Sequence, residues 1–301
     1  MSHPPADRVP RSRIAGAPIS WGVCEVPGWG HQLRPEQVLA EMRQLGLAAT
    51  EFGPDDFLPA EPAVRAAALE HYGLTAVGGF VPVVLHDPAR DPFPTVLRSL
   101  ATLRASDART LVLAADTGQV GYDSRPELDR AGWKWLLDNL DRIADTVAEV
   151  GVTAVLHPHV GTMVERADEV DRVLADSRIG LCLDTGHLVI GGTDPHQLVR
   201  QAAERIAHVH LKDVDAASAE QVRAGHTSYT RAVAAGMYRP LGTGHVEVAA
   251  IVAALEAADY QGWYVLEQDT VLATEPLPDS GPLRDVAASL SFLEGVSWSS
   301  T

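Results

Sequence analysis

Histidine and carboxylate side chains, with one lysine, recur where short apolar segments of this chain end. The residues concerned are Glu51; His157 and His159; Asp184 and His187; His210, Lys212 and Asp213; and Glu267 and Asp269. Imidazole and carboxylate ligands together suit Mn, Co, Fe or Zn, whereas all-oxygen sets suit Mg or Ca. Such side chains can also move protons next to a bound ion. Their types and positions therefore indicate metal-assisted acid–base chemistry.

The elements between these residues must bring them together. Apolar, β-rich runs alternate with amphipathic helical patterns, which predicts a parallel sheet covered by helices. The predicted strands are 14–20, 47–52, 74–80, 110–115, 152–157, 179–183, 206–211 and 263–267. The predicted helices are 35–45, 61–71, 95–106, 128–150, 166–175, 195–203, 246–258 and 283–293, and a polar excursion covers 212–244.

Eight strand–helix units predict an α/β fold of the closed (β/α)8 TIM-barrel type, with residues 1–301 as one domain and frayed ends at 1–13 and 297–301. The rival is an open doubly wound sheet, which usually carries a glycine-rich phosphate turn after its first strand. Residues 14–26 contain no GxGxxG motif. In a closed barrel the carboxyl ends of all strands meet at one mouth, where active sites are built.

Composition excludes several classes of function. The chain has 24 Lys and Arg against 40 Asp and Glu, a formal charge of −16, which argues against binding nucleic acid or an anionic membrane. It has no run of about 18 apolar residues and no signal-peptide segment, so we expect no membrane-spanning helix. Two cysteines, Cys24 and Cys182, form no disulfide framework, so we expect a cytoplasmic protein. The expected partner is a small molecule; a homo-oligomer is compatible with the fold, but no interface is apparent.

We assign Asp184, His210 and Glu267 as the core of a metal site, with His157 as the fourth ligand. Taken singly, an Asp before Thr-Gly is usually a turn or helix cap, and a His after a strand more often has a structural role. Four such residues at the same end of consecutive strands favour a shared metal site.

Three further polar residues each have two interpretations. His187 binds substrate or orients a ligand, or it simply starts a helix. Lys212 follows His210 by two positions and so faces the same side; its ammonium supports an oxyanion or forms an ordinary salt bridge to Asp213 or Asp184. Glu165 is a catalytic base or an acid favoured by a helix N-terminus.

Aromatic residues follow the early strands and either wall a pocket or pack ordinarily. We assign Trp21, Trp29 and Phe80, with Glu51, to substrate binding. Cys24 has no visible His partner and is not expected to be a nucleophile. The glycines of 240–244 precede a helix, where their amides would hold an anion or only form a turn.

Several motifs resemble a known superfamily. Leu-Asp-Thr-Gly-His (183–187), His-Val-His-Leu-Lys-Asp (208–213), Leu-Glu-Gln-Asp (266–269) and Pro-Leu-Gly-Thr-Gly-His-Val-Glu (240–247) are similar to the xylose-isomerase-like barrels of sugar isomerases and epimerases. The stretches 17–30, 50–59 and 157–165 are most similar to the inosose dehydratases within that superfamily. The likeness spans about Ala15 to Leu293.

The resemblance implies a lyase that acts on a keto-inositol with one divalent metal ion, Mn or Co before Mg, Fe or Zn. The matching ligands are Asp184, His210 and Glu267. Isomerases and epimerases carry a Glu, both ligand and base, where this chain has His157. This departure is consistent with elimination in place of epimerisation, and it leaves the fourth ligand open between His157, Glu165 and water.

The expected reaction is loss of water from 2-keto-myo-inositol through an enediolate, in a pathway of inositol catabolism. A base takes the proton next to the ketone, and an acid protonates the departing hydroxyl. Glu165 or His157 is the expected base, His159 or His187 the acid, and Lys212 the oxyanion support.

Three rival functions remain at this point. A ketose 3-epimerase or sugar isomerase would use the same metal site. A DNA-repair endonuclease would need about three metals and a basic groove, which the charge of −16 disfavours. A non-catalytic sugar-binding barrel is disfavoured by the intact set of ligands.

Overall fold

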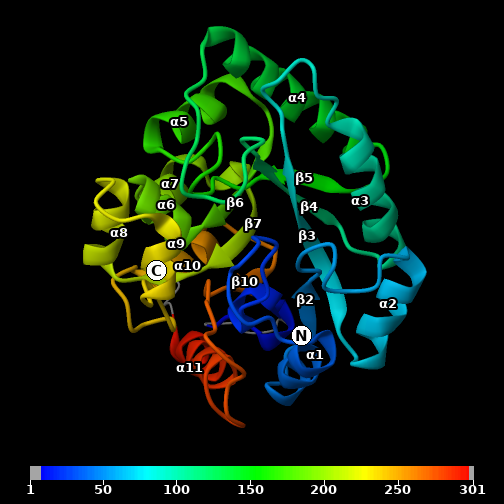
Figure 1. Ribbon diagram of the computed structural model, residues 1–301, viewed down its shortest axis with the longest axis vertical. Helices are drawn as coiled ribbons and strands as arrows, with labels where there is room; N and C mark the ends of the chain where they lie inside the picture. The colour runs from blue at the N-terminus through cyan, green and yellow to red at the C-terminus, as the bar shows by residue number, and fades with distance from the viewer. Residues whose placement is uncertain (1–7, 298–301) are drawn as a thin grey trace, which may run out of the picture.

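The computed structural model describes residues 8–297 and contains a closed barrel of eight parallel strands (Figure 1). The strands are β1 (Ile14–Gly16), β2 (Ala49–Glu51), β3 (Thr75–Val83), β4 (Thr110–Ala115), β5 (Thr153–Leu156), β6 (Gly180–Asp184), β7 (Ile206–Leu211) and β10 (Tyr264–Leu266). Their order around the barrel is β1-β10-β7-β6-β5-β4-β3-β2. The predicted TIM barrel is therefore confirmed, and the open sheet is excluded.

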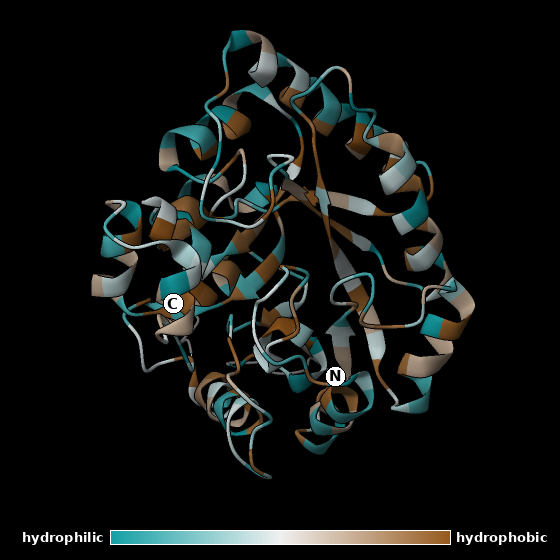
Figure 2. Ribbon diagram, in the orientation of Figure 1, coloured by the Kyte–Doolittle hydropathy of each residue, from teal (hydrophilic) through white to brown (hydrophobic). Residues whose placement is uncertain are grey.

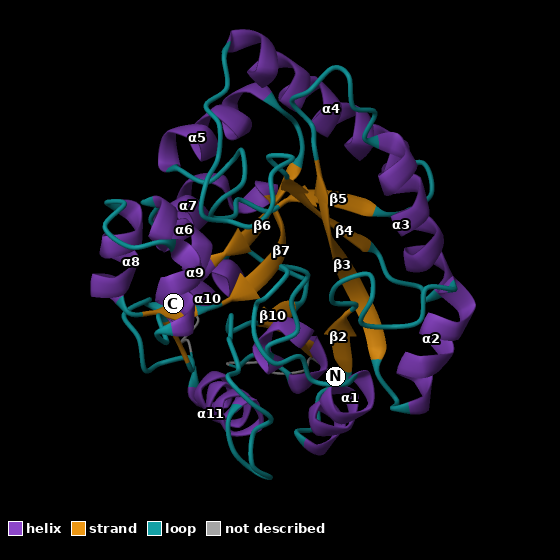
Figure 3. Cartoon of the chain, viewed as in Figure 1, coloured by secondary structure: helices purple, strands orange, loops and turns teal. Residues whose placement is uncertain are grey.

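Helices surround the barrel on the outside (Figure 3). They are α1 (Pro35–Gln44), α2 (Pro62–His71), α3 (Phe93–Ala105), α4 (Arg130–Ala148), α5 (Ala167–Asp176), α7 (Pro195–Ala202), α10 (Val248–Ala257) and α11 (Pro282–Gly295). Proline opens α1, α2, α7 and α11, because its fixed φ suits the first helical turn. The outer helices carry hydrophilic and hydrophobic residues side by side (Figure 2), as expected for helices packed on a barrel.

The sequence patterns miss several short elements. α6 (Thr185–Gly191) follows β6 directly, and the excursion after β7 contains α8 (Ala216–Arg223) and α9 (Tyr229–Ala234). The same region forms a two-stranded antiparallel sheet of β8 (Asp213–Val214) and β9 (Tyr238–Arg239). The predicted strand 14–20 ends at Gly16, because Pro18 opens a 3-10 turn, η2 (Pro18–Trp21).

Side-chain alternation along the strands aims the polar residues into the barrel. The register pairs Asp184 of β6 with His210 of β7, and His210 with Val265 of β10. Because paired residues of parallel strands face the same side, and because every second residue does so, His210 and Lys212 both face the interior. Polar side chains therefore gather at the carboxyl end of the barrel.

The N-terminal segment within the described residues is anchored rather than frayed. η1 (Arg11–Arg13) leads into β1, and Arg13 donates hydrogen bonds to the carbonyl of Gly262 at 3.1 Å and to Glu256 at 2.9 Å. The rest of the predicted frayed ends (1–13 and 297–301), namely residues 1–7 and 298–301, lies outside the described residues.

None of the helices within residues 8–297 is both long enough and apolar enough to span a lipid bilayer.

Candidate metal centre and active site

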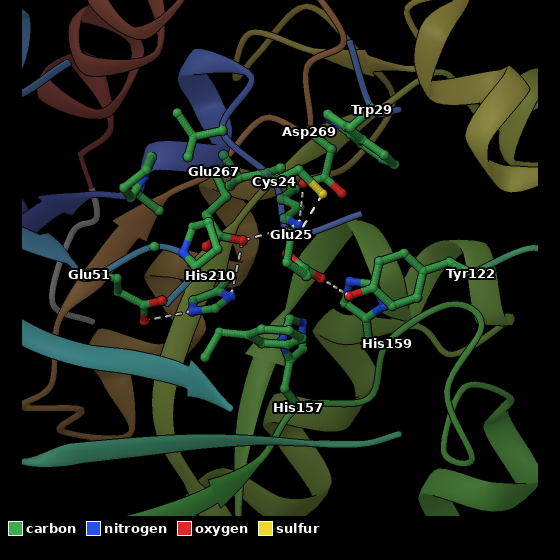
Figure 4. Close-up of a pocket in the computed structure, with 18 of the residues that line it drawn as sticks. Cys24, Glu25, Trp29, Glu51, Tyr122, His157, His159, His210, Glu267 and Asp269 are labelled. Carbon is green, nitrogen blue, oxygen red and sulfur yellow. Dashed lines mark hydrogen bonds and ion pairs between the residues drawn. The ribbon is translucent and has the colours of Figure 1, made fainter. Parts of the chain in front are cut away.

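A pocket opens at the carboxyl end of the barrel, where most of the predicted residues meet (Figure 4). Its polar lining comes from four different strand ends: Glu51 at the end of β2, His157 and His159 after β5, His210 in β7 with Lys212 just after it, and Glu267 and Asp269 after β10. Phe80 of β3 forms an apolar wall. The β1–α1 loop adds Trp29 and Glu25 at the mouth. The prediction that loop-distant residues share one site is thus consistent with the geometry.

Asp184, His210 and Glu267 fit a divalent cation. Each offers one ligand atom, and these atoms all lie within 4.8 Å of one another. The Nδ1 atom of His210 lies 3.2 Å from Glu267 Oε2 and 3.6 Å from Asp184 Oδ2. This nitrogen is buried and has no hydrogen-bond partner. A buried ring nitrogen between two carboxylates is the arrangement that a metal ion satisfies.

Asp184 combines the two interpretations that its sequence context allows. Its Oδ1 atom accepts hydrogen bonds from the backbone of Gly186 at 2.9 Å and His187 at 2.8 Å, and so caps α6. Its Oδ2 atom faces the cluster, 3.2 Å from the Nε2 atom of His157. One carboxylate oxygen therefore builds the helix, and the other is available as a ligand.

His157 lies beside this centre, and Glu165 does not. His157 is buried, and its Nδ1 atom has no partner. Glu165 instead accepts a hydrogen bond from the backbone of Gly161 at 2.8 Å and lies 3.6 Å from Arg125 Nε, outside the pocket. This position disfavours the predicted roles of Glu165 as base and fourth ligand, so His157 and water are the candidates for the fourth ligand.

Lys212 places a buried ammonium among three carboxylates. Its Nζ atom lies 2.6 Å from Asp269 Oδ1, 3.1 Å from Glu267 Oε2 and 3.4 Å from Asp184 Oδ2. Burial alone would lower the pKa of Lys212, but the three carboxylates outweigh burial and raise it well above its ordinary value. The residue is therefore a fixed positive charge beside the ligand set. The expected partner Asp213 is not among its contacts.

His159 and His187 form a stacked pair, with ring centroids 3.7 Å apart. The Nδ1 atom of His159 lies 2.7 Å from the carbonyl of Val160. Burial, helped by the nearby His157 and Lys212, lowers the pKa of His159 well below its ordinary value. The ring is therefore neutral, with its proton on Nδ1, and its Nε2 atom is free to accept a proton.

Three of the predicted substrate-binding residues line the pocket, and the fourth does not. Trp29 closes the mouth and donates from Nε1 to the carbonyl of Thr270 at 2.9 Å, and Phe80 packs edge-on to His157. Glu51 also lines the pocket, although its carboxylate forms hydrogen bonds with His208 and His210. Trp21 is fully buried in the core and donates to Glu41 at 2.7 Å, because η2 turns it away from the barrel mouth.

Four functional residues escaped prediction or received no role. Asp269 follows Glu267 by two positions, so strand alternation was enough to place it in the site. Tyr229 contacts Asp269 through its hydroxyl. It comes from α9, which no periodic pattern in the sequence predicts. The ring centroids of Tyr122 and His159 lie 4.5 Å apart, and the Tyr122 hydroxyl contacts the Glu25 carboxylate across the mouth of the pocket (Figure 4).

The cysteine at the pocket has no nucleophilic activation. Cys24 lies 3.7 Å from the carboxylate of Glu25, and burial together with this negative charge raises the pKa of its thiol. The thiolate, which is the reactive form, is therefore disfavoured.

The loop that carries His157 and His159 is held by a buried ion pair. Glu169 of α5 accepts two hydrogen bonds from Arg125, at 2.7 and 2.8 Å, and two more from the backbone of Glu165 and Arg166, both at 2.9 Å. On the other side of the loop, a Cβ at Gly161 would lie 2.3 Å from the carbonyl oxygen of Tyr122. The loop after β5 and the loop that carries Tyr122 therefore pack closely against each other.

We expect Glu169→Ala to destabilise the protein by about 1–3 kcal/mol, because five N–H donors, including Arg166 Nη2 at 3.1 Å, lose a buried acceptor. Burial would raise the pKa of Glu169, but Arg125 and the backbone N–H groups outweigh it and lower that pKa. The stabilisation is therefore present at neutral pH and is lost as the pH falls below about 4 and through the lowered pKa. Urea unfolding as a function of pH checks this.

Glu169→Gln tests the charge, since it keeps the shape of the side chain. Its stability should fall less steeply than that of the wild type in acid. Asp168→Asn is the matched control, because the Asp168 side chain is 82% exposed. Equal acid sensitivity of wild type and Glu169→Gln would contradict the argument.

The backbone N–H groups of the glycine-rich stretch 240–244 donate to a carboxylate of the protein itself, that of Asp213. Asp213 accepts hydrogen bonds from the backbone of Gly242 at 2.9 Å, Gly244 at 2.8 Å and Val246 at 2.9 Å. A Cβ at Gly244 would lie 2.2 Å from Asp213 Oδ1, so this close approach requires glycine. The loop is therefore fixed by hydrogen bonds to Asp213, the residue that follows Lys212.

Known proteins are similar to this chain over most of its length. Residues 39–294 match the family model of the xylose isomerase-like TIM barrel. The inosose dehydratase of Geobacillus kaustophilus is 35% identical over 276 residues, 87% of this chain and 89% of that protein. The rhizopine catabolism protein MocC of Rhizobium meliloti is 36% identical over 267 residues, 85% and 81% of the two chains. A solved structure, the IOLI protein with a binding zinc atom, matches in fold with a TM-score of 0.68 at 13% identity, over 96% of this chain and 100% of that one.

Proposed function

Because this chain belongs to the xylose isomerase-like TIM barrel family, and within it to the hydro-lyases of the inosose dehydratase type, we propose that it eliminates water from 2-keto-myo-inositol or a closely related cyclic polyol ketone. The reaction uses one divalent cation, with Mn or Co as the first candidates. The observation that carries the proposal is the unpartnered Nδ1 atom of His210 between Asp184 and Glu267, next to a neutral His159 and a charged Lys212.

Asp184, His210 and Glu267 would hold the cation. The chemistry that a divalent cation supplies when bound here is Lewis-acid polarisation of the substrate ketone. Lys212 places its ammonium 3.1 Å from Glu267 Oε2, so a ketone oxygen next to these ligands also lies within its reach. This fixed charge stabilises the negative charge that develops on the oxygen when the neighbouring carbon loses its proton.

His159 takes that proton. Its Nδ1–H group is tied to the carbonyl of Val160, so Nε2 is the atom that accepts. The resulting imidazolium then gives this proton to the hydroxyl that departs from the next carbon. The hydroxyl and the proton leave together as water. His187 stacks on His159 and keeps its ring in place. This assignment replaces Glu165, which lies outside the pocket.

The direct test is turnover of 2-keto-myo-inositol by the intact protein loaded with Mn²⁺ or Co²⁺. We expect NMR to detect a trihydroxycyclohexane-dione, the dehydrated product. A stereoisomer of the substrate would instead support the ketose epimerase. Absence of any conversion of this or a panel of related ring ketones by metal-loaded protein would refute the proposal.

A further inference from the structure

The carboxylate of Glu51 crosses the barrel to reach the proposed metal ligand. Glu51 ends β2, whereas His208 and His210 belong to β7, and β1 and β10 lie between these strands around the barrel. Two small interior residues of the intervening strands, Ala15 and Val265, pack in one cluster and leave room for the longer side chain. The barrel interior therefore has space for the Glu51 side chain to extend from β2 to His208 and His210 of β7.

Glu51 binds both imidazoles of β7 with a single oxygen. Its Oε1 atom lies 2.7 Å from the Nε2 atom of His208 and 3.0 Å from the Nε2 atom of His210. Glu51 is 3% exposed, and both histidines are 1% exposed. The same oxygen thus lies within hydrogen-bond distance of both ring nitrogens, and it accepts an N–H group from each ring.

We propose that Glu51 is a positioning residue that fixes the proton of His210 on Nε2 and so presents the Nδ1 lone pair to a metal ion. The proposal rests on the metal-dependent function given above. If the proton sat on Nδ1 instead, an N–H group would point at the ion between Asp184 and Glu267. A carboxylate behind a ligating histidine sets both the tautomer and the ring orientation, and its loss typically costs about 10–100-fold in metal affinity.

The test measures binding of Zn²⁺ and Mn²⁺ alone to metal-stripped, full-length protein by competition with a chromogenic chelator. Glu51→Gln keeps an oxygen acceptor but loses the charge, and we expect about 10-fold weaker binding. Glu51→Ala loses both, and we expect up to about 100-fold weaker binding. Thr50→Val is the matched control, because Thr50 is its fully buried neighbour on β2; its affinity should stay within about twofold.

A tautomer measurement separates positioning from a general loss of structure. In ¹⁵N-histidine-labelled, Zn²⁺-loaded wild type, we expect His210 to carry its proton on Nε2 only. Glu51→Ala should broaden or shift this signal, while Thr50→Val leaves it unchanged. If Glu51→Ala fails to fold, affinity and NMR of Glu51→Gln decide the question.

The outcomes distinguish the two proposals. Wild type that binds metal tightly, with Glu51→Gln and Glu51→Ala binding equally well, would overturn the role of Glu51 alone. Wild type that binds neither ion would overturn the proposed function and this inference with it.

Discussion

Asp184→Asn should lower kcat/KM by about 10³–10⁴-fold, because the metal ion supplies several kcal/mol of charge stabilisation. Asparagine keeps an oxygen that can cap α6, as Oδ1 of Asp184 does through Gly186 and His187. It replaces the charged Oδ2 atom, which faces His210. The substitution therefore removes a ligand and leaves the helix start intact. Steady-state kinetics and elemental analysis of the purified protein check both parts.

The chain contains a matched control for this substitution. Asp194 caps α7 by accepting from the backbone of His196 at 2.9 Å and Gln197 at 3.1 Å, and it faces no cluster. Asp194→Asn should therefore leave kcat/KM and metal content within about twofold of wild type. Chelation of the wild type should reproduce the loss seen in Asp184→Asn, and Mn²⁺ or Co²⁺ should restore activity to the wild type only. Full activity of stripped protein would refute a metal-dependent reaction.

Lys212→Met should have the second largest effect, with two consequences of opposite sign. We expect kcat to fall by about 10²–10³-fold, because the ammonium no longer stabilises the developing oxyanion. Metal affinity should rise, because Asp184, Glu267 and Asp269 lose a positive charge that lies within 3.4 Å of each of them. The metal-free variant should be destabilised by about 3–5 kcal/mol, since three buried carboxylates lose the ammonium that pairs with each of them.

The combination is diagnostic, since a merely misfolded variant would lose activity and metal affinity together. Kinetics under saturating Mn²⁺, chelator competition and thermal melts with and without metal measure the three effects. Lys134→Met is the control, because Lys134 pairs with Asp138 on the surface of α4, where its side chain is 74% exposed. Weaker metal binding by Lys212→Met would contradict the role of the ammonium as a competing charge.

The barrel was predictable because it follows from patterns that are local in sequence. Alternating apolar strands and helices, with proline at helix starts, located all eight strands, and β4 and β7 match residue for residue. α8 and α9 were missed because they span only eight and six residues. Their signals are the N-caps Asp215 and Ser228 rather than periodicity.

The candidate site was only partly predictable, because some side chains depend on loop conformation or on contacts across the barrel. Glu165 has the right spacing after β5, yet Gly161 and Arg125 hold it outside the pocket. The contact of Glu51 with His210 joins strands that are not neighbours, so it depends on the register of the whole closed sheet. Residues at strand ends, such as Asp184, could be placed from their position at the carboxyl end of a predicted barrel strand.

The hydrogen bonds of Asp213 bear on the kind of sugar that this enzyme accepts. TIM barrels often hold a substrate phosphate in the loops after strands seven and eight. In this chain the amides of Gly242, Gly244 and Val246, which follow the seventh barrel strand, already point at the Asp213 carboxylate. A phosphoryl group would have to displace a bonded side chain and would meet its negative charge. The enzyme should therefore turn over free polyol ketones and discriminate against their phosphate esters, which separates it from barrels that work on phosphorylated intermediates.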